Sequence, residues 1–81
     1  SRDEAQATLD QARGTYREAQ STLERTEGLV ERGVSTSVTL DATRTAAQEA
    51  ALAIMRAEAT LARFSSAEID DQPDVVVAAR N

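Results

Sequence analysis

Small or apolar residues in the first half of the chain recur at spacings that alternate between four and three. The series is Ala5, Leu9, Ala12, Tyr16, Ala19, Leu23, Thr26 and Val30. This alternation places every member on one stripe of an α-helix, which is the seam of a heptad repeat. The pattern predicts a first helix over about residues 2–32.

The same alternation returns in the second half of the chain. Its members are Leu40, Thr43, Ala47, Ala50, Ile54, Ala57, Leu61 and Phe64. We therefore expect a second helix over about residues 37–66, joined to the first by a turn at residues 33–36.

The two seams fit each other if the chain folds back at this turn. Val30 then faces Leu40, Ala5 faces Phe64, and all eight facing pairs have numbers that add up to 69 or 70. The sequence therefore predicts an all-α fold, a two-helix antiparallel coiled-coil hairpin over residues 1–66. Helices of roughly thirty residues, at about 1.5 Å per residue, would make a rod about 45 Å long.

The turn contains residues that end one helix and begin the next. Gly33 can adopt the left-handed conformation that follows a helix C-terminus, and Val34 would then contact Leu29 in a Schellman motif. Three hydroxyl residues follow, and any of them could accept a backbone N–H as the N-cap of the second helix. These candidates are Ser35, Thr36 and Ser37.

The C-terminal segment differs from the heptad region. Residues 67–72 are expected to form a loop, and Pro73 at the first position of a helix favours a short helical start over residues 73–81. The run Val75, Val76 and Val77 also allows a short strand there. Because the helical pattern begins at Ser1 and the chain stops abruptly, we expect the chain to be part of a longer protein.

Composition argues against catalysis and metal binding. The chain has no cysteine and no histidine, and aromatic residues make up 2% of it. We therefore expect no catalytic residue, no cofactor and no metal site, and interpret the acidic residues Glu24, Glu27 and Glu31 as a solvated face. Asp70 and Asp71 are adjacent in sequence, which suits a helix cap or a loop better than a catalytic pair.

Charge and hydropathy limit the possible partners. The net charge is −5, and nine arginines are interspersed with fourteen acidic residues, so nucleic acid is not an expected partner. No apolar run approaches the roughly 20 residues that a membrane span requires, and we expect no direct membrane insertion.

Alanines in the second helix extend beyond the seam. They are Ala42, Ala46, Ala51, Ala53, Ala59 and Ala62. Alanine is the strongest helix former, so these residues fit either helix propensity alone or lateral packing against a neighbour.

The turn and its flanks resemble the hairpin tip of periplasmic adaptor proteins, also called membrane fusion proteins of the HlyD-like family. The family pattern is an Arg, a Leu after three further residues, and a Ser after six more, with a Gly three before the Ser and often an Asp five after it. The matching positions are Arg25, Leu29, Gly33, Thr36 and Asp41. Thr36 stands where the family has Ser, or else Ser35 serves one place early. Residues 69–81 are similar to the point where the descending limb of inner-membrane-anchored adaptors breaks before a lipoyl-like domain.

This resemblance implies a non-enzymatic connector in tripartite efflux or secretion. Several adaptor hairpins, commonly six, would form a barrel whose tips meet a TolC-like outer-membrane channel, while the rest of the adaptor contacts an inner-membrane transporter. The protein would be periplasmic, with the full-length form anchored to the inner membrane. Arg25, Leu29 and Thr36 would be the tip contacts, whereas Gly33, Val34 and Ser35 would form the turn. The rival interpretation is a purely structural coiled-coil spacer or oligomerisation module.

Overall fold

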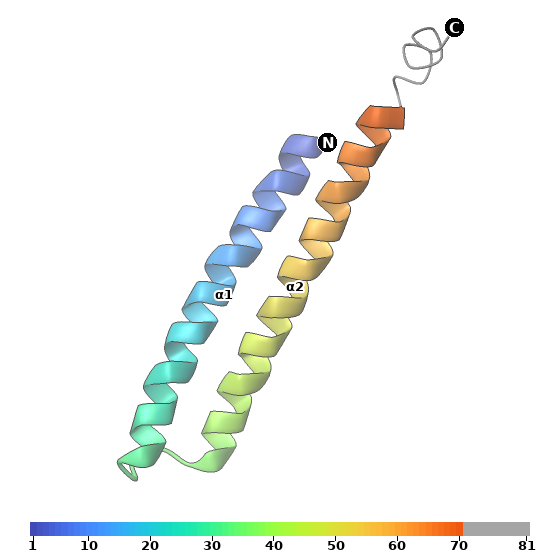
Figure 1. Ribbon diagram of the computed structural model, residues 1–81. Coiled ribbons are helices and arrows are strands. Elements are labelled where there is room, and N and C mark those ends of the chain that lie inside the picture. Colours follow the sequence, from blue (N-terminus) through green and yellow to red (C-terminus); the bar gives the residue numbers. More distant parts are fainter. Residues whose placement is uncertain (71–81) are drawn as a thin grey trace, which may run out of the picture.

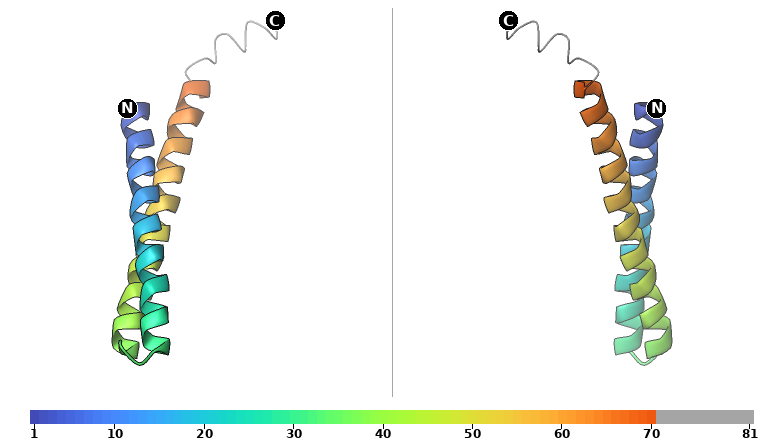
Figure 2. Two further views of the ribbon diagram at one scale, coloured as in Figure 1. Left: turned by 90° about the vertical axis from the view of Figure 1, so that its left-hand side faces the viewer. Right: turned by 90° about the vertical axis from the view of Figure 1, so that its right-hand side faces the viewer.

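The protein consists of two α-helices that lie side by side and run in opposite directions (Figure 1). The computed structural model describes residues 1–70, with side chains described through residue 64. Helix α1 spans Arg2–Glu31 and helix α2 spans Ser37–Asp70. Two views from the sides show the same pair packed along its length (Figure 2). The predicted all-α hairpin is confirmed.

The heptad seam is the contact between the helices. Each of the sixteen seam residues is buried or half-buried. The buried apolar members are Ala5, Leu9, Ala47, Ala50 and Ala57. An ion pair between Arg13 and Glu58, with Nη2 and Oε2 3.9 Å apart, also crosses from α1 to α2 beside the seam and agrees with the same register.

The core is thin. No side chain described by the structure is less than 2% exposed, and four of the five buried apolar residues are alanines. The buried polar residue Thr26 donates its hydroxyl to the carbonyl of Thr22 at 2.8 Å, so burial leaves it hydrogen-bonded. Since two helices can each bury only one stripe, this fold has little apolar surface with which to offset the entropy of folding.

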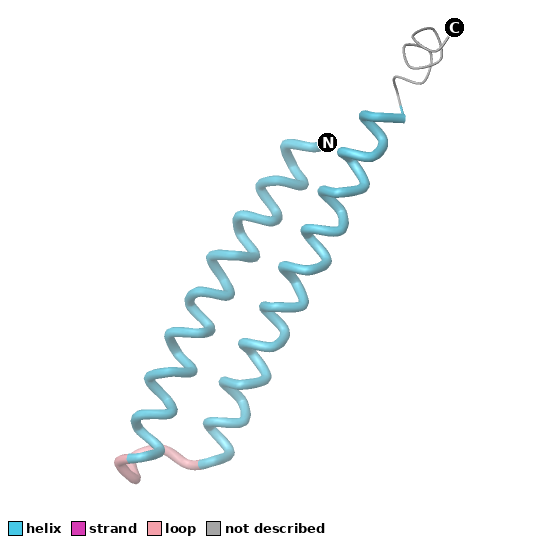
Figure 3. Tube along the Cα trace, viewed as in Figure 1, coloured by secondary structure: helices cyan, strands magenta, loops and turns pink. Residues whose placement is uncertain are grey.

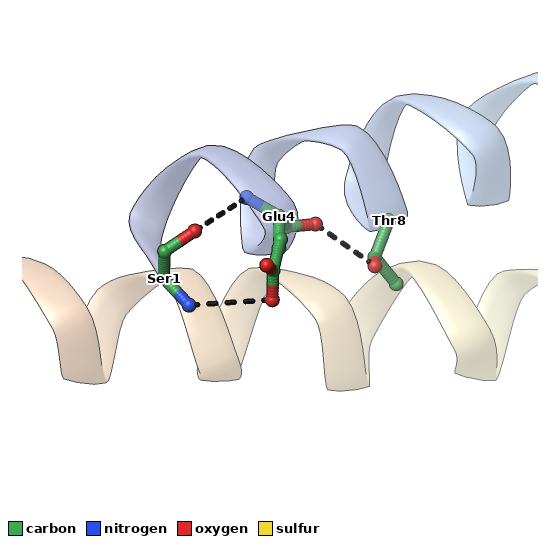
Figure 4. A network of polar contacts seen from close by, with 3 residues as sticks. All are labelled: Ser1, Glu4 and Thr8. Carbon is green, nitrogen blue, oxygen red and sulfur yellow. Dashed lines mark hydrogen bonds and ion pairs between the residues drawn. The ribbon is translucent and has the colours of Figure 1, made fainter.

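Helix α1 begins with a capping box (Figure 4). The Ser1 hydroxyl accepts from the backbone N–H of Glu4 at 3.3 Å, and the Ser1 amino group donates to the Glu4 carboxylate at 3.5 Å. Thr8 donates its hydroxyl to the Glu4 carbonyl one turn later, at 3.0 Å. Ser1 is the N-cap of α1 in this chain.

Helix α1 ends in the predicted Schellman motif, and a short loop leads from there to α2 (Figure 3). Gly33 has φ of +74°, its N–H donates to the carbonyl of Val30 at 3.0 Å, and the N–H of Val34 donates to the carbonyl of Leu29 at 2.8 Å. These are the two backbone bonds that define the motif, with Arg32 as the C-cap.

The predicted end of the second helix was wrong. Helix α2 continues through Asp70, so residues 67–70 are helical and do not belong to a loop. The sequence after residue 64 contains no glycine, and Pro73 is the first residue that prevents helix continuation, which explains the longer helix. The rest of the predicted loop and the predicted helical start at residues 73–81 lie outside the described residues.

Candidate functional site at the hairpin tip

The tip displays Arg25 and Leu29 on α1. The two residues are four apart, so they stack on one side of the helix. Arg25 is exposed and lines a shallow surface depression with Arg17, Glu18, Ser21 and Thr22. Leu29 is half-buried, and its carbonyl accepts the N–H groups of Val34 and Ser35. The guanidinium is therefore open to a partner, while Leu29 is partly engaged in closing the hairpin.

Thr36 is the N-cap of α2. Its hydroxyl accepts the backbone N–H of Thr39 at 3.3 Å and lies 3.2 Å from the Thr39 hydroxyl. Its side chain is exposed, so it could also contact a partner, but its hydroxyl oxygen already caps α2. The sequence pattern could not choose among the three hydroxyl residues, because all of them are good caps.

The remaining turn residues serve the chain reversal. Val34 is 71% exposed, so its side chain gains little burial from Leu29. Ser35 is half-buried and donates its N–H to the Leu29 carbonyl at 3.3 Å. Asp41 lies in the second turn of α2, beyond the reach of the unpaired N–H groups, and forms an ion pair with Arg44 at 3.9 Å.

The two sides of the seam differ in charge. In an antiparallel heptad pair, the residues that directly follow every second seam residue of one helix face the equivalent residues of the other helix. They lie along one side of the rod. Here these positions form what we term the charged edge, and they hold Gln6, Arg13, Gln20, Glu27, Arg44, Ala51 and Glu58. Arg13 and Glu58 form the ion pair across this edge, and Glu27 lies opposite Arg44 in the same register.

The other side carries no charge at any of its positions. We term it the neutral edge, and it comprises Thr8, Thr15, Thr22, Leu29, Thr39, Ala46, Ala53 and Thr60. Each residue on α1 faces one on α2, with numbers that add up to 68 in every pair. Every one of these side chains is exposed or half-buried.

A shallow groove follows the neutral edge near the open end of the hairpin. Ala5 and Thr8 line it from α1, and Ala53, Arg56, Ala57 and Thr60 line it from α2. Sequence analysis missed this surface because it followed only the seam. The signal in the sequence was the lack of charge at every residue that directly precedes every second seam residue.

The alanines beyond the seam do not form one smooth face. Ala46 and Ala53 lie on the neutral edge, Ala51 lies on the charged edge, and Ala59 lies on the outer face of α2 near the exposed residue Met55. Helix propensity accounts for the scattered members, whereas those on the neutral edge add to an uncharged surface.

The part of the chain that the structure describes contains no group of three or more acidic side chains placed to hold a metal ion. Within residues 1–70, neither α1 nor α2 has a stretch with the length and hydropathy that a membrane-spanning helix requires.

No protein family, curated protein or solved structure was found to match the chain.

Proposed function

We propose that this chain is the hairpin domain of a periplasmic adaptor that links an inner-membrane transporter to a TolC-like outer-membrane channel. The observation that carries the proposal is the tip, where a closed turn displays an exposed Arg25 one helical turn from Leu29. The resemblance of these positions to the adaptor pattern gives them their roles.

Each tip residue would make a different contact. The Arg25 guanidinium offers a forked donor for carbonyls or carboxylates at the end of the channel, and Leu29 offers an apolar contact. Thr36 is exposed, so its methyl group can touch the partner while its oxygen stays in the cap. A contact this small is weak alone, so docking would depend on several hairpins, six in a hexameric adaptor, binding together.

The proposal predicts that tip variants impair transport in the full-length protein. Arg25→Ala removes a charge-assisted contact, which we expect to weaken one docking contact by about tenfold or more. Leu29→Ala removes the apolar contact. Transport should fall in both variants, while adaptor abundance and helicity by circular dichroism change little.

Matched controls are available on the same rod. Arg63→Ala removes an exposed arginine near the end of the rod opposite the tip, and Leu52→Ala removes an exposed leucine on the outer face of α2. Both controls should transport normally. Normal transport in both Arg25→Ala and Leu29→Ala would rule out the tip contact.

A structural spacer is the second candidate, and one observation favours it. The Schellman bonds at Gly33 and the cap at Thr36 explain the turn by helix termination alone. In a spacer, Arg25 would only be solvated. The Arg25→Ala experiment separates the two candidates, because a spacer predicts no effect on transport.

A further inference from the structure

The two tip residues on α1 are the last members of a longer row of side chains. Residues four apart form one continuous ridge on a helix surface. The members of this ridge, which we term the arginine ridge, are Arg17, Ser21, Arg25 and Leu29. Arg13 precedes the row by four residues, but its guanidinium already pairs with Glu58. The row of unpaired side chains therefore begins at Arg17.

Both arginines of the ridge are open to an anionic group. Among the residues that the structure describes, neither the Arg17 guanidinium nor the Arg25 guanidinium has a hydrogen-bond or ion-pair partner, and both side chains are exposed. Arg44, by contrast, pairs with Asp41 at 3.9 Å. The Arg17 Nη2 lies 3.9 Å from the place that a Cβ of Gly14 would take, so the missing side chain of Gly14 leaves this guanidinium uncovered.

The depression between the two arginines offers further polar contacts. It is lined by Arg17, Glu18, Ser21, Thr22 and Arg25. Within the described part of the chain, the hydroxyls of Ser21 and Thr22 have no hydrogen-bond partner, whereas those of Thr8 and Thr60 donate to carbonyls of their own helices at 3.0 Å. Two arginines and one glutamate give the depression a net charge of +1, although the whole chain carries −5.

We infer that the arginine ridge binds an acidic segment of the channel on which the tip docks, with one carboxylate against Arg17 and another against Arg25. Arginine pairs with carboxylates through its forked donors, and the free hydroxyls between the two arginines can donate to the same groups. Charge favours this occupant, because a chain of net charge −5 repels an acidic segment elsewhere and attracts it at the ridge.

This assignment rests on the proposed docking function and adds to it the chemistry and the extent of the contact. At about 1.5 Å per residue, Arg17 lies about 24 Å along the helix axis from the turn at Gly33. The channel would therefore overlap the side of α1 and would not meet the hairpin at its end alone.

The test is transport by the full-length protein with substitutions in the depression. Arg17→Gln removes one charge, which we expect to weaken each docking contact by about two- to fivefold, and transport should fall because several hairpins bind together. Arg17→Lys keeps the charge and should keep most of the transport, whereas Arg17→Glu should lose the most. Glu18→Gln removes the carboxylate that repels an acidic segment, so it should maintain or raise transport.

Arg56→Gln is the matched control. Arg56 is also exposed, and its guanidinium also has no partner among the described side chains, but it lies on α2 outside the depression. This variant should transport normally, and adaptor abundance and helicity by circular dichroism should be unchanged in all variants.

The outcomes separate the ridge from the tip. Normal transport in Arg17→Gln and Arg17→Glu, together with reduced transport in Arg25→Ala, would overturn the ridge contact and leave the tip contact standing. Normal transport in both Arg25→Ala and Leu29→Ala would instead remove the docking function and the ridge contact with it. Equal losses in Arg17→Lys and Arg17→Gln, a loss in Glu18→Gln, or a loss in Arg56→Gln as large as that in Arg17→Gln would each contradict binding of an acidic segment at the ridge.

Discussion

Gly33 and Gly28 show how one residue type can have opposite effects five residues apart. Gly33 has φ of +74° and ends α1, where a side chain is strained although no atom lies within 4 Å of the position of a Cβ. Gly28 is inside α1, and a Cβ there would meet only the end of the Arg32 side chain, at 3.8 Å. The cost at Gly33 is therefore conformational rather than steric.

We expect Gly33→Ala to destabilise the hairpin by about 1 kcal/mol, because an L-residue in the left-handed region loses about 1–2 kcal/mol. Gly28→Ala should stabilise it by about 0.5–1 kcal/mol, since alanine replaces glycine within a helix. Urea unfolding monitored by circular dichroism at one protein concentration measures both. A stabilising Gly33→Ala would contradict the assigned role of its backbone conformation.

The Thr36 hydroxyl caps the first turn of α2, so this one side chain helps to fix where the helix begins. Loss of such a cap costs about 1 kcal/mol. We therefore expect Thr36→Ala to destabilise the hairpin by about that amount in urea unfolding, while Thr36→Ser keeps the oxygen and most of the stability. Ser37→Ala is the control, because the Thr36 hydroxyl, and not that of Ser37, accepts the Thr39 N–H.

The same pair of variants separates capping from docking. Thr36→Ser deletes only the methyl group, so a transport defect in this variant would come from the partner surface. Equal stability of Thr36→Ala and the wild type would show that the cap contributes nothing.

The elements themselves could be predicted because a heptad seam has a strict period and Gly33 stops a helix by a local mechanism. The end of α2 could not be placed as well, because the sequence from Ser65 to Asp70 contains neither a seam residue in the assigned series nor a helix breaker. The neutral edge was also missed. All of its members except Leu29 are threonines or alanines, which give little hydrophobic signal in the sequence and are recognised as one surface only when both helices are in register.

At the scale of the whole molecule, the hairpin combines a long seam with a small core. Alanines at Ala47, Ala50 and Ala57 bury little area each, and the opposed pair Thr26 and Thr43 places two hydroxyl residues in the seam near the tip. Both hydroxyls bond to carbonyls of their own helices, at 2.8 Å each. They therefore add no bond between α1 and α2, and the isolated rod has few sources of stability apart from contact with a neighbour.

Stability should therefore depend on protein concentration. If folding is coupled to the association of two copies, each tenfold increase in concentration should raise the Tm by about 3–6 °C for a chain of this size. Thermal unfolding by circular dichroism, repeated over a concentration series, measures this slope. A Tm that is independent of concentration in the wild type would mean that the two-helix rod is stable alone, and its alanine-rich seam would then supply more stabilisation than its buried area suggests.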